Sequence, residues 1–370
     1  MLYLCRLFYL TIIFSVLHSA ISNAEPPDPV SLYQINKASE NIATIAPDFA
    51  KNFIFCPQGV NAVEAISSVL PNPVSWIKKT PEPLKDLFDQ YVFKDDDNEV
   101  LRSANFIFSR HVLQDNYRRF LEEKGHPHIF DDRGSYPQAV SEANKIISEL
   151  TNAALKNIIN EEKADFAFIV TNVVYFKAKW GVPCEEAPPM IWNSAPNTSK
   201  KVDSFKVGAN DNQGVKAGKA HGYSVYSIPV NEAEGKYKFI IAIPDKSFGK
   251  KPEQAILDGK IAESCIEAAK TAQQLDDDTV LMVPDFYIEQ EHNLKDLFVS
   301  QFPFEISQQV FIKVNKNGVE AFADTEMVVM DGGKDMKVIE INEPFAFWVI
   351  DEKKSKILFT GTVYHPQYNK

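Results

Sequence analysis

The sequence predicts an α+β fold, a single domain in which helices surround one large mixed sheet. A chain of 370 residues, 45% of them hydrophobic, is long enough to bury a sizeable core. Helical periodicity and continuous apolar runs are mixed along the chain without a repeating unit, and no change of composition separates two cores. We therefore expect one domain over residues 25–370.

The helices and strands of this domain follow from the spacing of apolar residues. Helical periodicity predicts amphipathic helices over residues 60–70 and 143–159. Continuous apolar runs are typical of strands buried on both faces, and they occupy residues 166–176, 239–243, 345–350 and 357–359. Polar stretches predict loops at residues 193–201, 208–218 and 331–335.

The first 24 residues predict a secretory signal peptide. Arg6 precedes an apolar run from Leu7 to Leu17, and small residues ending in Ala24 follow it. This run of 11 residues is far shorter than the ~20 that cross a bilayer as a helix. We expect removal of residues 1–24, a secreted, extracellular chain of 346 residues and no membrane contact, with an N-terminal anchor helix as the alternative.

Export decides how the cysteines and the glycosylation sequon are interpreted. Cys56, Cys184 and Cys265 remain after Cys5 leaves with the signal, so at least one thiol is unpaired. They permit three single-bridge arrangements, among which the sequence does not choose. Cys56 follows an apolar stretch and is expected to be buried. The sequon at Asn197 lies in a polar segment, which predicts a glycosylated surface loop.

Charge and motifs exclude several classes of function. With 39 Lys and Arg against 50 Asp and Glu, the net charge is −11, which argues against DNA, RNA or heparin as partners. His126-Pro127-His128 lacks the spacing of a helical zinc site. Gly222-Tyr223-Ser224 resembles half of a nucleophile elbow, but Tyr226 replaces the second glycine, so a strand start is predicted. We expect no metal, no cofactor and no enzymatic activity.

Two long segments carry a family resemblance. One runs from Thr171-Asn172-Val173 to Lys179-Trp180, and the other joins Asn342-Glu343-Pro344-Phe345 to the strand after residue 356. With shorter matches such as Val283-Pro284-Asp285-Phe286, they span most of the mature chain in the expected order, and the sequence resembles the serpin family. The chain is shorter than a serpin between residues 70 and 105. In this trimmed, exported form it resembles serpin-like proteins of insect reproductive fluid.

The resemblance implies a loop that a protease cleaves as it would cleave a substrate. An exposed reactive loop, at about residues 318–341 here, is cleaved and inserts as a new strand into the main sheet, while the acylated protease is dragged along. Insertion requires alternating side chains. Every second residue from Val319 is small or apolar, in the set Val319, Ala321, Ala323, Thr325, Met327 and Val329. The alternative is one long native strand over residues 310–329.

The resemblance also assigns hinge and scissile residues. The hinge comprises Lys316, Gly318, Val319, Ala321 and Ala323, with Lys316 where serpins usually carry an acidic residue. Counting along the loop places the scissile bond near Gly332 or Gly333. If the register shifts, Met330 implies a chymotrypsin-like target and Lys334 a trypsin-like one.

A polar cluster of two serines, an asparagine and a histidine holds the sheet-opening region of serpins. The matching residues here are Cys56, Gly59, Asn172 and Gln308, of which only Asn172 is retained. Each unsatisfied buried partner would cost ~1–3 kcal/mol unless Gln308 or water replaces the lost bonds. Trp180 lies where the loop would enter the sheet, either as a gate or as an ordinary core aromatic.

Two hypotheses remain from the sequence. In the first, the chain is a monomeric, secreted inhibitor that covalently traps an extracellular serine protease. In the second, it is a serpin-fold carrier or signalling protein without inhibitory activity, as Lys316 and the pair Gly332-Gly333 favour.

Overall fold

A computed structural model describes most of the chain after residue 31. The described residues are 32–45, 51–68, 100–110, 112–113, 115–124, 127–131, 135–151, 159, 168–195, 198–208, 214–230, 237–297, 304–319 and 336–366. Within them, no helix is both long and apolar enough to span a membrane. The predicted signal peptide lies outside the described residues.

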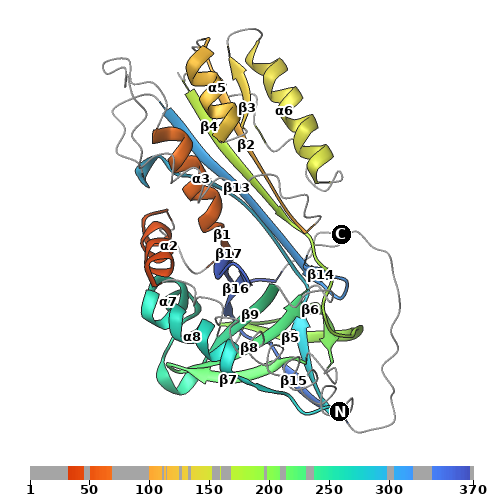
Figure 1. The fold of residues 1–370 in the computed structure, drawn as a ribbon. Helices are drawn as coiled ribbons and strands as arrows, with labels where there is room; N and C mark the ends of the chain where they lie inside the picture. The colour runs from red at the N-terminus through yellow and green to blue at the C-terminus, as the bar shows by residue number, and fades with distance from the viewer. Residues whose placement is uncertain are drawn as a thin grey trace, which may run out of the picture.

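Strands form three sheets in this part of the chain (Figure 1). The longest strands belong to a sheet ordered β12-β13-β4-β2-β3, with β14 paired to β13. Its bounds are β12 Phe286–Asn293, β13 Phe304–Asn315, β4 Phe168–Phe176, β2 Leu101–Ser109, β3 His128–Asp131 and β14 Gly318–Val319. The central pair, β13 and β4, is parallel, and β4 is buried along its whole length.

Two further sheets lie at the other end of the molecule (Figure 1). One is ordered β1-β17-β16-β9-β8-β7-β10, with bounds Phe53–Phe55, Lys356–Val363, Phe345–Asp351, Tyr237–Pro244, Tyr223–Val230, Lys216–Ala220 and Gln273–Gln274. The other is ordered β15-β11-β6-β5, with bounds Lys337–Glu340, Thr279–Pro284, Thr198–Val207 and Cys184–Ala195.

Helices cover these sheets. The described helices are α2 Leu32–Ile45, α3 Pro57–Ser68, α5 Asp115–Lys124, α6 Tyr136–Leu150, α7 Pro252–Leu257 and α8 Gly259–Thr271, with short 3-10 turns η1 Lys246–Phe248 and η2 Lys295–Leu297. Alternate residues of β4 face opposite sides of the long sheet. Ile169 and Val173 pack in one core with Val140 and Ile147 of α6, whereas Val174 and Phe176 belong to the core on the other face.

The predicted strands are confirmed as β4, β9, β16 and β17, and β8 begins at Tyr223 as expected. The helix predicted over residues 143–159 is too long, because α6 ends at Leu150 with its carbonyls capped by Thr151. Ile159 returns to α6, where its backbone N–H and carbonyl bond to the side chain of Asn144. Because Ile159 is apolar and packs against α6, the sequence pattern looks as if the helix continued to residue 159.

The prediction of a loop over residues 193–201 is also wrong. Asn193 and Ala195 belong to β5, and Thr198 to Lys201 begin β6, so the segment is a β-hairpin whose exposed strands carry polar side chains. Asn197 itself lies outside the described residues. Cys56, Cys184 and Cys265 are all free thiols, and burial raises the pKa of Cys56 and of Cys265 to about 12.

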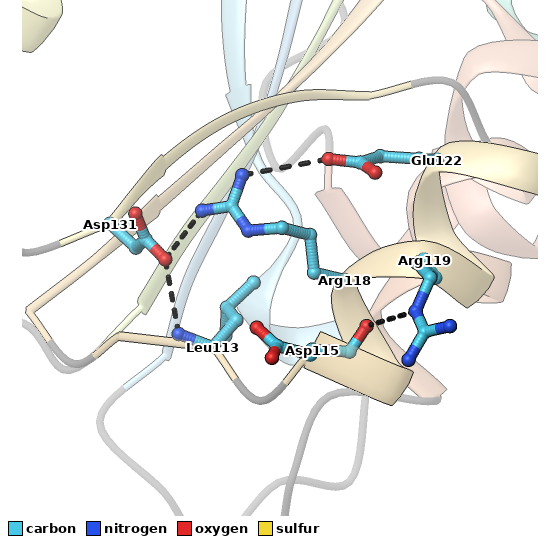
Figure 2. Close-up of polar contacts among 6 residues, drawn as sticks. All are labelled: Leu113, Asp115, Arg118, Arg119, Glu122 and Asp131. Atoms are coloured by element: carbon cyan, nitrogen blue, oxygen red, sulfur yellow. Dashed lines mark hydrogen bonds and ion pairs between the residues drawn. The ribbon is translucent and has the colours of Figure 1, made fainter.

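A partly buried ion pair fixes α5 beside β3 (Figure 2). Asp131, at the end of β3, is 2.5 Å from the guanidinium of Arg118, and it also accepts from the backbone N–H of Leu113 at 3.1 Å. Glu122, one turn along the helix, lies 3.5 Å from the same guanidinium. The hydrogen bond with Asp131 raises the pKa of Arg118. Asp131 therefore holds together the strand β3, the helix α5 and the segment that leads from β2 into α5.

Candidate functional site

The candidate site is the seam between β4 and β13, the two central strands of the long sheet. These strands are paired from Phe304 opposite Phe168 to Val310 opposite Val174. Beyond Val310 the ladder between them stops, although β13 continues to Asn315. The chain then turns at Lys316 and Asn317, so the alternative of one long strand over residues 310–329 is wrong.

Val319 occupies the space between the two strands where their ladder stops. Its N–H donates to the carbonyl of Ala178, and the N–H of Ala178 donates to the carbonyl of Val319, both at 3.0 Å. On the other side, Val319 lies opposite Val314 of β13. Its side chain is fully buried in the core that also holds Val174 and Val310. One residue of the predicted loop therefore already forms the first position of a strand between β4 and β13.

Gly318 is required at this turn for two reasons. Its φ of +140° is a conformation that side chains disfavour. A Cβ at this position would also lie 2.1 Å from the carbonyl oxygen of Ala178. The backbone can approach Ala178 closely enough for Val319 to bond because glycine precedes it.

Trp180 holds in place the turn that follows β13 at Lys316 and Asn317. Its indole N–H donates to the carbonyl of Asn315 at 2.7 Å, and its ring is buried against Phe205 and Phe239, with ring centroids 5.7 and 5.8 Å away. It is thus both a core aromatic and a direct contact of the hinge turn.

Lys316, directly after the end of β13, forms an ion pair. Its ammonium lies 2.9 Å from the carboxylate of Glu186 on β5, an exposed ion pair that links the turn to the four-stranded sheet. Close to it is Asp285, whose Oδ1 is buried without a hydrogen-bond partner among the described residues. Asp285 was not among the predicted site residues. An acidic residue directly after the fully buried, apolar strand β11 was the signal that could have found it.

The four residues of the predicted sheet-opening cluster come together beneath the seam. Gln308 lies opposite Asn172 across the seam, and its amide both accepts from the N–H of Cys56, at 3.2 Å, and donates to the carbonyl of Cys56, at 2.8 Å. Gly59 donates its N–H to the sulfur of Cys56 at 3.4 Å. Gln308 thus supplies the polar contacts at the start of α3.

Asn172 bonds on its own side of the seam. Its amide group donates to Ser103, at 3.0 Å, and to Asn105, at 2.9 Å, both on β2, and its Oδ1 is buried without a partner among the described residues. On the opposite face of the sheet, the hydroxyls of Thr171 and Ser307 are 2.9 Å apart and bond across the seam. Opening the seam would leave the bonds of Asn172 and Gln308 described above intact.

Two residues of β12 that the sequence analysis missed hold the free edge of β1. Gln290 accepts from the N–H of Ile54 at 2.7 Å and donates to the carbonyl of Asn52 at 3.0 Å. His292 lies 2.5 Å from the carbonyl of Ile54, and burial lowers its pKa. These contacts tie the β12–β13 half of the sheet to β1. Their sequence signal is weak, because Gln290 and His292 alternate with Glu289 and Glu291 as in a solvated strand.

Several predicted residues lie outside the described residues. They are the hinge residues Ala321 and Ala323, the scissile candidates Met330, Gly332, Gly333 and Lys334, and the sequon residue Asn197. Both ends of the loop predicted at residues 318–341 are strands, β14 at Gly318–Val319 and β15 at Lys337–Glu340. Residues 320–335, between these two strands, lie outside the described residues.

Comparisons with known proteins identify this arrangement. The sequence matches the family described as "Serpin (serine protease inhibitor)" over residues 61–301 and 300–366. It is 22% identical over 340 residues to "Serine protease inhibitor 2" of Anopheles gambiae, covering 83% of this chain and 80% of that one.

Solved structures agree with the sequence comparison. Human kallistatin matches with a TM-score of 0.70 and 14% identity, covering 92% of this chain and 98% of that one. Human thyroxine-binding globulin matches with a TM-score of 0.66 and 15% identity, covering 90% of this chain and 100% of that one. The fold is the mixed α+β serpin fold, and the chain belongs to the serpin family.

Proposed function

We propose that the chain is a secreted inhibitor of an extracellular serine protease, acting by loop cleavage, strand insertion and covalent trapping. The observation that supports this most is Val319, bonded between Ala178 and β13 as the first residue of a strand. The family description and the mosquito relative's name support protease inhibition in general. Signal cleavage after Ala24, glycosylation of Asn197 and a monomeric state remain proposals from the sequence.

The pairing of Val319 fixes where the following residues would lie if the strand continued. Val319 is antiparallel to both neighbours, opposite Val314 on one side and Ala178 on the other. Each advance of two residues along the loop therefore moves two residues back along both neighbours. By this register, Thr325 would lie between Gln308 and Asn172.

This register suits the residues that would enter. Val319 faces the apolar core, so the small and apolar set that alternates with it would enter the same core. Thr325 would bring a hydroxyl beside Asn172, whose buried Oδ1 lacks a partner among the described residues. At ~1.5–3 kcal/mol per large buried aliphatic and ~0.5–1.5 kcal/mol per ladder bond, insertion would release on the order of 10 kcal/mol.

A second candidate function is a serpin-fold carrier or signalling protein that does not trap proteases. The ion pair of Lys316 with Glu186 and the hydrogen bond of Trp180 to Asn315 favour it, because both anchor the hinge turn. The thyroxine-binding globulin structure is of a complex with its hormone, so this fold can carry a small ligand.

The deciding experiment is incubation of the purified protein with trypsin-like and chymotrypsin-like proteases. The inhibitor proposal expects an adduct that survives denaturing electrophoresis. Replacement of Thr325 by arginine should abolish the adduct and leave plain loop cleavage, because a cation cannot be buried between Asn172 and Gln308 at low cost. The same replacement at Thr44, exposed on α2, is the matched control and should trap normally. Cleavage without any adduct by either protease class would favour the carrier.

A further inference from the structure

The hinge turn lies beside a group of charged side chains that strand insertion alone does not use. Asp285 connects β11, in the four-stranded sheet, to β12, in the sheet that contains β4 and β13. It directly precedes Phe286, which is paired with Val314, so Asp285 lies beside Asn315 at the start of the hinge turn. Its backbone N–H donates to the carbonyl of Asp203 on β6 at 2.9 Å. Figure 1 shows the same meeting of the β13 end, β14 and β6.

The carboxyl group of Asp285 is partly buried and has charged neighbours of both signs. Its Oδ1 is buried without a hydrogen-bond partner among the described residues. The charged groups that face it are Glu186 of β5, Asp203 of β6, and Lys313 and Lys316 of β13 and its turn. The ammonium of Lys316 lies 2.9 Å from the carboxylate of Glu186, so it pairs with Glu186 rather than with Asp285.

We propose that Asp285 is a proton-controlled latch on the hinge. In its neutral form it allows β14 to stay bonded between Ala178 and β13, and in its ionised form it weakens that position. An ionised Asp285 places a buried charge beside two other carboxylates and competes with Glu186 for Lys316. The inference rests on the proposed function in taking Val319 as the hinge of an inserting strand.

The direction of the pH effect follows from proton linkage. Burial first, then Asp203 and Glu186, raise the pKa of Asp285 to about 7, and Lys316 and Lys313 partly oppose them. In an opened hinge the carboxyl group would be solvated, with a pKa near ~4. Between these values the closed hinge binds more protons than the open one. Raising the pH from ~4 to ~7 therefore favours opening by up to about tenfold per pH unit, and the effect levels off above this window.

The test is hydrogen–deuterium exchange of the intact chain between pH 5 and 8, corrected for the intrinsic exchange rate. The reporters are the amides of Val319 and Ala178, both hydrogen-bonded across the hinge. In the wild type, their opening should increase several-fold per pH unit up to about pH 7 and then stay constant. In Asp285→Asn, it should stay at the low, acid-like level throughout. Asp245→Asn, which removes an exposed carboxylate of the β9–η1 connection, should behave as the wild type.

A second variant keeps the test independent of how well Asp285→Asn folds. Glu186→Gln removes a negative neighbour and releases Lys316 toward Asp285, so the plateau should begin at lower pH. A flat wild-type profile, or the same pH dependence in Asp285→Asn, would overturn the latch. The readout needs no protease, so failure to trap a protease and failure of the latch are distinguishable.

Discussion

Gly59 shows how one residue sets the polar cluster beneath the seam. A Cβ at this position would lie 2.0 Å from Oδ1 of Asn172 and 2.4 Å from Nε2 of Gln308. The amide groups of Asn172 and Gln308 therefore occupy the space that a side chain at position 59 would need. Gly59 is matched to both amides, and Gln308 supplies the hydrogen bonds to Cys56.

This pairing predicts non-additive substitutions. Gly59→Ser should destabilise the chain by ~1–3 kcal/mol through overpacking, and Gly59→Ala should cost about the same, since the clash is made by Cβ. Gln308→Ala should cost ~1–3 kcal/mol by removing the acceptor of the buried N–H of Cys56. In the double variant Gly59→Ser with Gln308→Ala, the clash with Gln308 disappears while the one with Asn172 remains, so part of the overpacking is relieved and the cost should fall at least ~0.5 kcal/mol below the sum. Denaturant unfolding midpoints measure the cycle, and strictly additive costs would contradict it.

At the same scale, the sequence could predict residues whose environment is apolar or locally determined. Cys56 is buried, as the three apolar residues before it predict, and Gly318, predicted as a hinge residue, has a positive φ. Asp285 and His292 could not be predicted in this way. Their surroundings come from Asp203, Glu186 and Ile54, which are far away in the sequence and are brought near only by the sheets.

Among elements, α5 shows how few contacts can dock a short helix. It has ten residues, and its charged positions outnumber its apolar ones. Leu121 is buried, and Arg118 ties the helix to the nearly inaccessible side chain of Asp131 (Figure 2). Elements of this kind escape hydrophobic periodicity, and the helix was not among those predicted. The strands β4, β9, β16 and β17 were predicted because both of their faces are buried.

The docking of α5 is therefore sensitive to a single carboxylate. Asp131→Asn should destabilise the chain by ~1–3 kcal/mol, because Arg118 loses its buried partner. Hydrogen exchange should accelerate in α5 and β3 and stay unchanged in β9 and β16. Glu149→Gln, which removes only the exposed pair with Lys145 at 3.9 Å, is the control and should cost less than ~0.5 kcal/mol. Equal effects of the two variants would mean that the Asp131 contact contributes little.

For the whole molecule, the central question is whether the seam accepts a complete strand. The β12–β13 half is tied to β1 and α3 through Gln290, His292 and Gln308, whereas Asn172 is tied to β2. The two halves can therefore separate while each keeps its own polar contacts. Among the described residues, the bonds that would break include the ladder from Val310 to Phe304 and the hydroxyl pair of Thr171 and Ser307. An inserted strand would replace the ladder with two new ones.

Loop cleavage followed by thermal unfolding tests this separation without any trapped protease. Insertion worth on the order of 10 kcal/mol should raise the melting temperature by roughly 10–20 °C for a chain of this size. Cleaved Thr325→Arg should show no such rise, because its side chain would stop the strand at Asn172, and cleaved Thr44→Arg should match the cleaved wild type. An unchanged melting curve after cleavage of the wild type would mean that Val319 is the end of the strand rather than its beginning. The seam would then be a closed structural feature, as the carrier hypothesis requires.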